Sequence, residues 1–544
     1  MKAEAGKVFR SPFPALDIPS VTIGALVLAR ADRLADKPAL IDAATGRTLT
    51  YGALRDQVRA FAANLSSCGL RRGEVIAVLM PNLPEYAVVF HGTVLAGGVV
   101  TTVNPSYTAR EVQAQCIDAA ATWLVTVPAC LEVARAAAAG TTVREILLAG
   151  GDPVEIAAAC AAARADGRRG PAVTPLSAML RPPSPDSPTA APIRGSADEI
   201  VVLPYSSGTT GVSKGVMLTH RNLVANVMQT NSLVGLREDD VMMAVLPFFH
   251  IYGMQVMMNS GLAMGMTLVT MPRFELETFL RAHQQYRITC TYVAPPIVVA
   301  LARHPMVAQF DLGSLRFMLS GAAPLSAALA LEAGRRIGCE IVQGYGMTEL
   351  SPVTHFTPPG SNRPGASGLT VANTECRIVD PESGESLGPD RDGELWVRGP
   401  QVMAGYLNRP QETAATIDRD GWLHTGDIAH FDADGYLYLV DRLKELIKYK
   451  GFQVPPAELE ALLMTHPAVA DVAVVGLPDE QAGELPVAFV VLKPGQSATD
   501  AQLMAYVAGQ VAHYKQLRRV TFIETVPKSA SGKILRRLLR DPAR

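Results

Sequence analysis

Residues 205–223 read YSSGTTGVSKGVMLTHRNL, and this stretch decides how the rest of the chain is interpreted. Glycines let the backbone pass close to a ligand, hydroxyl and free N–H groups hydrogen-bond phosphate oxygens, and a lysine adds a mobile positive charge. Apolar residues at 199–204 predict a buried strand and residues from 222 onward predict a helix, so we expect a strand-to-helix turn, where anions are commonly held. The candidate phosphate ligands are Ser206, Ser207, Gly208, Thr209, Thr210, Gly211 and Lys214.

Two other interpretations of this loop are weaker. It is not a Walker A motif, because that motif needs Gly-Lys-Ser/Thr and here the lysine precedes a glycine. A flexible Ser/Gly linker is disfavoured, because linkers rarely continue into an apolar helix.

Composition limits the class of protein. A chain of 544 residues exceeds what one hydrophobic core usually supports, and 48% apolar with 18% charged residues argues for large buried cores rather than disorder. A net charge of −2 gives no global sign of nucleic acid or an anionic membrane as partner. Seven dispersed cysteines without a C-x-x-C pair predict reduced, buried thiols, as is typical of a cytoplasmic protein. We expect no signal peptide, lipidation signal or peroxisomal address.

The most apolar window, 84–103, contains Glu85, His91 and three glycines. It therefore predicts a core helix followed by a strand rather than a membrane span.

The order of expected elements predicts an α/β fold. Short apolar strands alternate with helices up to about residue 148 and again from 199 to 319, beginning with an expected helix at 22–32, which implies parallel strands with helices on both faces. Five prolines in 182–193 indicate a surface linker. We predict a large multi-lobed N-terminal domain of doubly wound sheets with a β-rich subdomain at 1–441, and a small α+β C-terminal domain at 442–544.

Residues 343–354, QGYGMTELSPVT, form the second candidate site. Gly344 and Gly346 flank Tyr345, which leaves an aromatic face beside bare backbone, suited to stacking on a planar base. Thr348 could bond a phosphate, and Glu349 suits Mg²⁺, which takes few protein ligands in addition to phosphate. A glycine-rich turn without function is an equal alternative for this segment alone.

Charged residues mark a third site at 421–460. Asp427 and Arg442 are candidates for a ribose, since a carboxylate accepts hydrogen bonds from both hydroxyls. Three lysines lie within seven residues, beside Gly451: Lys444, Lys448 and Lys450. A solvated basic helix face is the alternative.

The fourth site is VPKSASGKILRRLLR at 526–540, where Lys533 follows Ser-Gly in a loop. Arg536, Arg537 and Arg540 fit an ordinary basic helix, and a nucleic-acid tail is disfavoured because aromatic residues do not interleave the charges. His250, in the apolar run PFFHIYG, is by itself more often a core residue than a catalyst.

Together and in this order, the motifs resemble the adenylate-forming superfamily of acyl-CoA synthetases, peptide-synthetase adenylation domains and luciferases. The resemblance runs from LTYGALRDQVRAFAANL near the start to SGKILRR near the end. Its details are most similar to the 4-coumarate:CoA ligase branch. The segments that carry this likeness are NPSYTARE, FFHIYG, VAPPIVVAL, GYGMTEL, GYLNRP, GWLHTGD and DRLKELIKYKGFQVPPAELEALL.

The resemblance implies an ATP-dependent reaction in two steps, with Mg²⁺ and coenzyme A. A carboxylate attacks the α-phosphate of ATP, giving acyl-AMP and pyrophosphate, and the coenzyme A thiol then displaces AMP to give a thioester. Both partners of the first step are anionic, so cations must neutralise their approach. By this resemblance Lys533 would bridge the carboxylate and the α-phosphate. Residues 206–214 would hold the β- and γ-phosphates, while Thr348 and Glu349 would serve the α-phosphate and Mg²⁺.

The resemblance also assigns the remaining site residues. Adenine would be framed by Gly321, Ala322, Ala323, Gln343, Gly344, Tyr345, Gly346 and Met347, with Asp427 and Arg442 on the ribose. The small domain would rotate about a hinge near Lys444, withdrawing Lys533 and bringing in Lys448, Lys450, Gly451 and Gln453 for thioester formation. His250 would gate an acyl pocket lined by Tyr252, Val256, Gly344, Gly346, Pro352 and Val353.

Departures from the family pattern concern the pocket and its surroundings. Ala322 replaces a glycine that is common in the family, and Ser213 stands where proline is usual in the phosphate loop. Gln255 stands where plant hydroxycinnamate ligases usually have asparagine, and Val256 and the pair Leu350-Ser351 differ from their usual counterparts. These differences leave the identity of the acid open, although not the type of reaction.

We therefore predict a cytoplasmic acid–thiol ligase that acts on 4-coumarate or a related hydroxycinnamate, with ATP, Mg²⁺ and coenzyme A. Alternatives are a medium-chain fatty acid as substrate, a luciferase-like oxygenase, or a carrier protein in place of coenzyme A. A non-catalytic nucleotide-binding protein is the alternative from another class, and it would be expected to have lost Lys533 or Glu349. We expect a small carboxylic acid as partner, with no nucleic acid and no membrane span.

Overall fold

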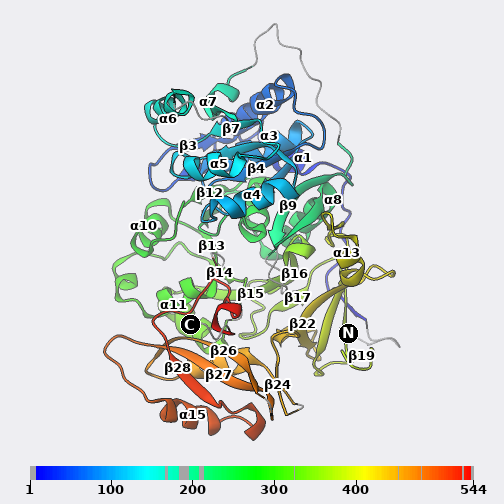
Figure 1. Cartoon of the computed structure of the whole chain (residues 1–544), viewed down its shortest axis with the longest axis vertical. Helices are drawn as coiled ribbons and strands as arrows, with labels where there is room; N and C mark the ends of the chain where they lie inside the picture. The colour runs from blue at the N-terminus through cyan, green and yellow to red at the C-terminus, as the bar shows by residue number, and fades with distance from the viewer. Residues whose placement is uncertain are drawn as a thin grey trace.

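Three sheets organise the described chain (Figure 1). The computed structural model describes residues 8–165, 170–182, 195–206, 213–323, 325–450, 452–479, 481–529 and 532–540. The upper sheet in Figure 1 takes most of its strands from residues 75–219, the largest sheet combines strands from residues 9–50 with strands from 241–442, and residues 447–522 form a third sheet at the bottom. The predicted mixed α/β fold is confirmed.

The upper sheet has the order β21-β10-β9-β5-β4-β6-β7-β8. It is parallel from β9 to β8 and antiparallel at β10 and β21. Its strands are β4 (Val75–Leu79), β5 (Val99–Thr102), β6 (Ala121–Thr126), β7 (Glu145–Leu148), β8 (Ala172–Pro175), β9 (Ile200–Ser206), β10 (Lys214–Thr219) and β21 (Gly405–Tyr406). The accompanying helices are α2 (Tyr51–Ser67), α3 (Pro84–Leu95), α4 (Ala109–Asp118), η1 (Pro128–Cys130), α5 (Leu131–Ala138), α6 (Pro153–Ala165) and α7 (Leu176–Met179).

The largest sheet has a parallel half and an antiparallel half. β15, β14, β13, β11, β12 and β2 run parallel, whereas the strands beyond β15 are antiparallel, as predicted for a β-rich region. The strands of the parallel end are β2 (Pro38–Asp42), β3 (Thr48–Thr50), β11 (Val241–Ala244), β12 (Thr267–Thr270), β13 (Cys290–Val293), β14 (Phe317–Ser320) and β15 (Glu340–Gly346). The antiparallel end contains β1 (Phe9–Arg10), β16 (Val353–Phe356), β17 (Gly368–Thr370), β18 (Glu375–Val379), β19 (Ser386–Leu387), β20 (Gly393–Arg398), β22 (Leu423–Phe431) and β23 (Tyr436–Arg442).

Helices around this sheet carry much of the site. They are α1 (Ile23–Leu28), α8 (His220–Val234), η2 (Tyr252–Asn259, a π-helix), α9 (Ser260–Met264), α10 (Leu276–Tyr286), α11 (Pro295–Arg303), η3 (Pro305–Gln309), α12 (Ala327–Ile337), η4 (Thr348–Leu350) and α13 (Pro410–Thr416).

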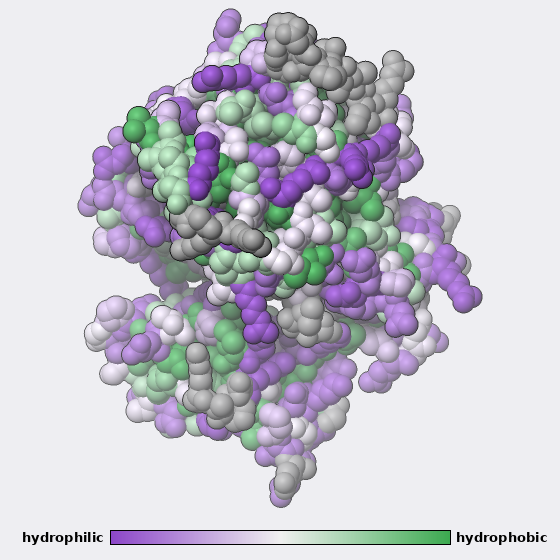
Figure 2. All heavy atoms as spheres, turned by 45° about the horizontal axis from the view of Figure 1, so that its top comes forward, coloured by the Kyte–Doolittle hydropathy of each residue, from purple (hydrophilic) through white to green (hydrophobic). Residues whose placement is uncertain are grey.

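The third sheet has the order β25-β24-β27-β26, with β28 parallel to β27. Its elements are β24 (Ile447–Tyr449), β25 (Phe452–Val454), α14 (Pro456–Leu463), β26 (Val469–Asp479), β27 (Gly483–Leu492), α15 (Asp500–Ala508), η5 (His513–Lys515), β28 (Arg519–Phe522) and α16 (Arg537–Arg540). In the space-filling view of Figure 2 the surface is indented between the large upper part and the smaller lower part of the molecule.

The expected strand-to-helix turn at the phosphate loop is wrong. Residues 214–219 form β10, which pairs antiparallel with β9 and places Lys214 opposite Ser206, so the loop joins two strands. Val216 and Leu218 are fully buried, with the half-buried Met217 between them, which fits a strand with one face toward the core. α8 begins only after Thr219, whose side chain accepts a hydrogen bond from the N–H of Asn222 in a capping box.

Four other expectations, on the apolar window, one helix, the lysine segment and the cysteines, had different outcomes. The apolar window at 84–103 consists of α3 and β5, as predicted, and no helix in the described ranges is both long and apolar enough to cross a bilayer. The helix expected at 22–32 ends at Leu28. Lys448 lies on a strand, so the alternative of a basic helix face is wrong. All seven cysteines are free and five are buried, but Cys130 is only half-buried and Cys68, at the solvent-facing end of α2, is exposed.

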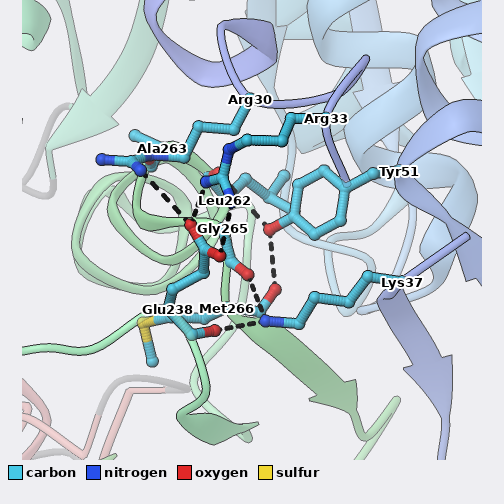
Figure 3. Close-up of polar contacts among 9 residues, drawn as sticks. All are labelled: Arg30, Arg33, Lys37, Tyr51, Glu238, Leu262, Ala263, Gly265 and Met266. Carbon is cyan, nitrogen blue, oxygen red and sulfur yellow. Dashed lines mark hydrogen bonds and ion pairs between the residues drawn. The ribbon is translucent and has the colours of Figure 1, made fainter. Parts of the chain in front are cut away.

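A charged cluster fastens the segment after α1 to the largest sheet (Figure 3). Arg30 Nη1 lies 3.3 Å from Glu238 Oε2, and Arg33 Nη1 lies 3.0 Å from Glu238 Oε1. The Lys37 ammonium donates to the carbonyl oxygens of Glu238 and Gly265. The Glu238 carboxylate, between α8 and β11, therefore binds two arginines, while Lys37 joins the backbone there to the turn between α9 and β12.

Acid should weaken this fold through histidines that are neutral in the folded chain. Burial lowers the pKa of His91, His250 and His355 to about 3, and of His220 and His283 to about 4. The unfolded chain takes up protons as the pH falls through about 6.5, while the folded chain does not, so stability is lost below that pH. Between pH 7.5 and 5.5 we expect a loss in unfolding free energy of about 1.4 kcal/mol per histidine.

Urea unfolding of the wild type and of His283→Gln at both pH values measures one such contribution. His283 is 1% exposed, and its ring nitrogens contact Phe279 O and Thr291 Oγ1, both at 2.7 Å, contacts that an amide can partly replace. On acidification the variant should lose less unfolding free energy than the wild type, and the difference should be about 1.4 kcal/mol. An equal loss in the two proteins would contradict the assignment.

Candidate active site

The predicted site residues converge where strands of the largest sheet end. β14 ends at Ser320, which lies opposite Gln343 of β15. On the antiparallel side, β22 and β23 place Asp427 opposite Arg442. The carboxyl ends of adjacent parallel strands are where α/β sheets commonly bind ligands.

Glu349 is held firmly at this site. The Ser206 hydroxyl donates to Glu349 Oε1 at 3.0 Å, and the Tyr406 hydroxyl donates to the same oxygen at 2.9 Å. The N–H of Met403 donates to the Glu349 carbonyl at 2.9 Å, and the residue is 5% exposed. No residue in the described part of the chain donates to Oε2, so one carboxylate oxygen is left for a ligand.

This geometry fits a magnesium ion better than a metal held by protein alone. The described residues contain no group of three or more His, Cys, Asp or Glu side chains that could hold a metal. Mg²⁺ commonly binds through one or two carboxylates, together with waters and substrate phosphates. Glu349, next to Thr348 and facing the strand that leads into the phosphate loop, supplies such a carboxylate.

Asp427 is fixed by two partners. The Tyr345 hydroxyl donates to Asp427 Oδ2 at 2.6 Å, and Arg442 Nε lies 3.4 Å from Oδ1. Burial raises the pKa of Asp427, and the nearby Arg442 charge opposes that shift. The Tyr345 ring is mostly buried, at 8% exposure, so its hydroxyl end is anchored while the glycines beside it leave open backbone.

Lys533 lies at the end of a short hairpin. The N–H of Ser529 donates to the Lys533 carbonyl at 2.8 Å, and the N–H of Lys533 donates to Ser529 Oγ at 3.1 Å. Gly532 has φ of +83°, a conformation that favours glycine, and a Cβ there would lie 3.4 Å from Ala294. The hairpin therefore packs against the residues that precede α11.

The ammonium of Lys533 lies within electrostatic reach of the charged residues of the site. Burial is the main cause that lowers the pKa of Lys533, followed by the positive charge of Arg442, while Glu349 and Asp427 act in the opposite direction. Across the described ranges, no carboxylate lies within ion-pair distance of this ammonium. Its charge is therefore available to an incoming anion.

The phosphate loop itself is only partly described. Lys214 forms an ion pair with Glu412, and its ammonium lies 4.9 Å from the centre of the Tyr406 ring. The predicted ligands Ser207, Gly208, Thr209, Thr210 and Gly211 lie outside the described residues, as does Gly451.

The predicted acyl-pocket residues lie on η2 and at the ends of β14, β15 and β16. A Cβ at Gly321 would lie 3.0 Å from Tyr252 Oη, and a Cβ at Gly346 would lie 2.1 Å from the Pro352 carbonyl oxygen. Glycine is therefore required at 346, and Tyr252 packs against bare backbone at 321. Tyr252 Oη is buried and has no hydrogen-bond partner among the residues that the structure covers.

The remaining residues predicted for the acyl pocket and the adenine site lie on the same elements or in the turns beside them. Val256 is 2% exposed on η2 and Val353 is 7% exposed on β16. Ala322 has φ of 71°, in the left-handed region that favours glycine, which explains why the family commonly has glycine there. Ala323 follows it in the same turn, and Met347 precedes η4.

The side-chain amide of Gln255 is bonded to other protein groups and is not free to contact a substrate. Its Nε2 donates to the Leu223 carbonyl of α8 at 2.7 Å, and its Oε1 accepts from Asn259 Nδ2 at 2.8 Å. Both ends of the amide are thus used within the protein, and they tie η2 to the first turn of α8.

His250 is held as a neutral imidazole. Its Nδ1 accepts a hydrogen bond from the N–H of Tyr252 at 3.2 Å. Burial, and after it the charge of Lys533, lowers the pKa of His250 to about 3. The ring therefore acts by shape and hydrogen bonding at neutral pH, and not as an acid.

The residues expected in the second step are not brought to this site. Lys448 and Gln453 face each other across the β24–β25 hairpin, and both are exposed, as are Lys444 and Lys450. Within the described ranges, no hydrogen bond or ion pair joins any of these four to Glu349.

Sequence reasoning missed several partners in the site: Tyr406, Glu412 and Arg536, which pairs with Glu445. Tyr406 belongs to GYLNRP, a segment that carried the family resemblance. The sequence therefore marked this segment, but it did not reveal that Tyr406 bonds Glu349. Pairings between distant segments leave no local pattern in the sequence.

Comparison with known proteins agrees with this geometry. The model of the AMP-binding enzyme family matches residues 27–407, and that of the AMP-binding enzyme C-terminal domain matches 458–533. The chain belongs to the AMP-binding enzyme family. The predicted place in the adenylate-forming superfamily is thereby confirmed, and the chain is an enzyme of the AMP-binding type.

Relatives of this AMP-binding enzyme extend over its whole length. The 4-coumarate–CoA ligase 5 of Oryza sativa subsp. japonica is 43% identical, over 98% of this chain and 97% of the relative. ATP-bound MatB from Rhodopseudomonas palustris is 31% identical with a TM-score of 0.83, over 95% of this chain and 98% of that structure. The anthranilate CoA ligase AuaEII in complex with anthranoyl-AMP is 27% identical with a TM-score of 0.85, over 96% and 97%. Two of these three proteins bear the name of a CoA ligase.

Proposed function

We propose that this enzyme converts 4-coumarate or a related hydroxycinnamate to its coenzyme A thioester through an acyl-AMP intermediate. The observation that carries the proposal is the unpaired ammonium of Lys533 facing Glu349 and Asp427, in a chain that is 43% identical to a 4-coumarate–CoA ligase. We propose a cytoplasmic location, with phenylpropanoid acids as the substrates.

In the first step, a carboxylate oxygen of the acid bonds to the α-phosphorus of ATP, and the bond to the bridging oxygen of pyrophosphate breaks. Lys533 neutralises the charge that both reactants carry, which is the largest electrostatic obstacle to their approach. Asp427, held by Tyr345 and Arg442, accepts hydrogen bonds from the ribose hydroxyls. The Ser206–Lys214 loop binds the β- and γ-phosphates, for which Lys214 exchanges its pairing with Glu412.

Mg²⁺ bound at Glu349 supplies further charge neutralisation at the phosphates. The carboxylate is suited to this role because Ser206 and Tyr406 occupy only Oε1.

In the second step, the coenzyme A sulfur bonds to the acyl carbon and AMP leaves. We propose that residues 442–544 turn relative to 1–441 near Lys444, which would withdraw Lys533. Lys448, Lys450, Gly451 and Gln453 would then take part in thioester formation. Support comes from the exposure of Lys448, Lys450 and Gln453, since exposed side chains can form new contacts.

The acid is proposed to lie between η2 and the ends of β14, β15 and β16. The aromatic ring packs beside Tyr252, Val256 and Val353, and the close approach of Gly346 to Pro352 leaves flat backbone on one side. The names of the relatives favour a hydroxycinnamate over a medium-chain fatty acid. Retention of both Lys533 and Glu349 argues against a non-catalytic protein.

The test is acid-dependent release of pyrophosphate and AMP, with and without coenzyme A, for cinnamate, 4-coumarate, caffeate, ferulate, benzoate, hexanoate and octanoate. Hydroxycinnamates should give the highest kcat/KM, and the product should be a thioester. Higher kcat/KM for the aliphatic acids would retain the ligase reaction and reject the substrate. No turnover with any acid would reject the proposal.

A further inference from the structure

Arg536 directly follows the hairpin that carries Lys533, and it is buried in a network of ion pairs. Its Nη2 lies 2.7 and 2.8 Å from the two carboxylate oxygens of Glu460, and its Nε donates to the Val474 carbonyl at 3.1 Å. Its Nη1 lies 2.5 Å from Glu445 Oε2. The Arg536 side chain is 12% exposed, and those of Glu445 and Glu460 are 20% and 14% exposed.

This network fastens one strand of the hairpin to the edge of the third sheet. β26 is the edge strand, and Val474 lies within it; Glu460 Oε1 also accepts from the Val474 N–H at 2.7 Å. The other strand of the hairpin is fastened separately, by Lys528 Nζ at 2.6 Å from Asp471 Oδ2. The hairpin is therefore anchored on both sides of Lys533, by Lys528 before it and by Arg536 after it.

Glu445 connects this anchor to the charge of the active site. It follows the segment 441–444, where we propose the turn between the two parts of the chain. Its carboxylate acts on both Lys533 and Arg442 electrostatically, yet its ion pair is with Arg536. Without Arg536, Glu445 would be an unpaired carboxylate near the Lys533 ammonium.

We infer that Arg536 is a positioning residue for Lys533: it anchors the hairpin and keeps Glu445 from pairing with the Lys533 ammonium. The inference rests on the proposed role of Lys533 in adenylate formation. Arginine suits the task because its planar guanidinium binds one carboxylate through two bonds and still reaches a second. The sequence alone favoured an ordinary basic helix for this residue, and it distinguished Arg536 in no way from its exposed neighbour Arg537.

The test compares Arg536→Gln, Arg536→Lys, Glu445→Gln and the double variant Arg536→Gln/Glu445→Gln, with Arg537→Gln as the matched control. Each protein is assayed with 4-coumarate for pyrophosphate release and, separately, for thioester formation from supplied coumaroyl-AMP and coenzyme A. Thermal midpoints report on folding.

Arg536→Gln should lower kcat for pyrophosphate release about tenfold to a hundredfold, because a small displacement of a positioned group has effects of this size. Thioester formation from the supplied adenylate should stay near the wild-type rate. Arg536→Lys should lose less of the pyrophosphate release than Arg536→Gln. Arg537→Gln should release pyrophosphate at the wild-type rate. The double variant should release pyrophosphate faster than Arg536→Gln, since the competing carboxylate is gone.

A purely structural role makes the opposite prediction, that removing Glu445 as well brings no recovery. Such a result, or equal losses in both half-reactions, would overturn the inference. If Arg536→Gln does not fold, Arg536→Lys against Arg537→Lys decides, and equal pyrophosphate release by these two would overturn it. A wild type that releases no pyrophosphate with any acid would instead reject the proposed function.

Discussion

Lys533→Ala should lower acid-dependent pyrophosphate release by about a hundredfold to a thousandfold, the usual effect of removing one preorganised electrostatic group. Its ammonium faces Glu349, Asp427 and Arg442 and has no ion-pair partner in the described part of the chain. The variant therefore loses a positive charge that is free to neutralise the two anionic reactants. Thioester formation from supplied acyl-AMP should be largely retained, because no anion has to approach a phosphate in that step. Single-turnover assays of the two half-reactions measure this difference.

Two controls define the origin of the effect. Lys533→Arg keeps the charge and should retain more pyrophosphate release than Lys533→Ala. Lys528→Ala removes one anchor of the hairpin, its ion pair with Asp471, but leaves the Lys533 ammonium in place, and should therefore lose less pyrophosphate release than Lys533→Ala. Equal losses in both half-reactions of Lys533→Ala would contradict the role given to this residue.

Glu349→Gln should lower pyrophosphate release by a similar factor, about a hundredfold or more. The amide keeps the shape and can still accept from Ser206 and Tyr406, but it lacks the charge with which we propose that Glu349 binds Mg²⁺. The variant should also need a higher Mg²⁺ concentration for half-maximal rate, which a magnesium titration of the first half-reaction measures.

Tyr406→Phe is the matched control, because it removes one hydrogen bond to the same carboxylate oxygen and leaves the charge. It should cause a much smaller loss and little change in magnesium dependence. If Tyr406→Phe and Glu349→Gln shift the magnesium requirement equally, the carboxylate is a structural anchor rather than a metal ligand.

Much of the architecture could be predicted because the order of residues within short segments indicates helices, strands and turns. Alternating buried strands and helices indicated the parallel sheets, and the glycine-rich motifs around residues 206, 344 and 532 indicated the site. What local patterns could not give is the partner of each charged side chain. Ser206 and Glu349 are 143 residues apart, and Arg536 and Glu445 are 91 apart, so only the folded chain reveals these pairs.

Two local features were also beyond prediction. η2 is buried at every position, so it shows no amphipathic period from which a π-helix could be told from an α-helix. The strand β10 was hidden because it is short and runs directly into the strong helix pattern of α8.

The hydrogen bond from Gln255 to the Leu223 carbonyl has a practical consequence for redesign of the acid specificity. α8 begins directly after β10, the strand that leads away from the phosphate loop, so the wall of the acid pocket and the nucleotide side share one rigid frame. Shortening Val256 should remove volume from the wall of the proposed pocket and leave that frame intact, whereas changing Gln255 should loosen the frame itself. An engineer who wants a roomier pocket without a penalty on ATP should begin at position 256 and keep position 255 unchanged.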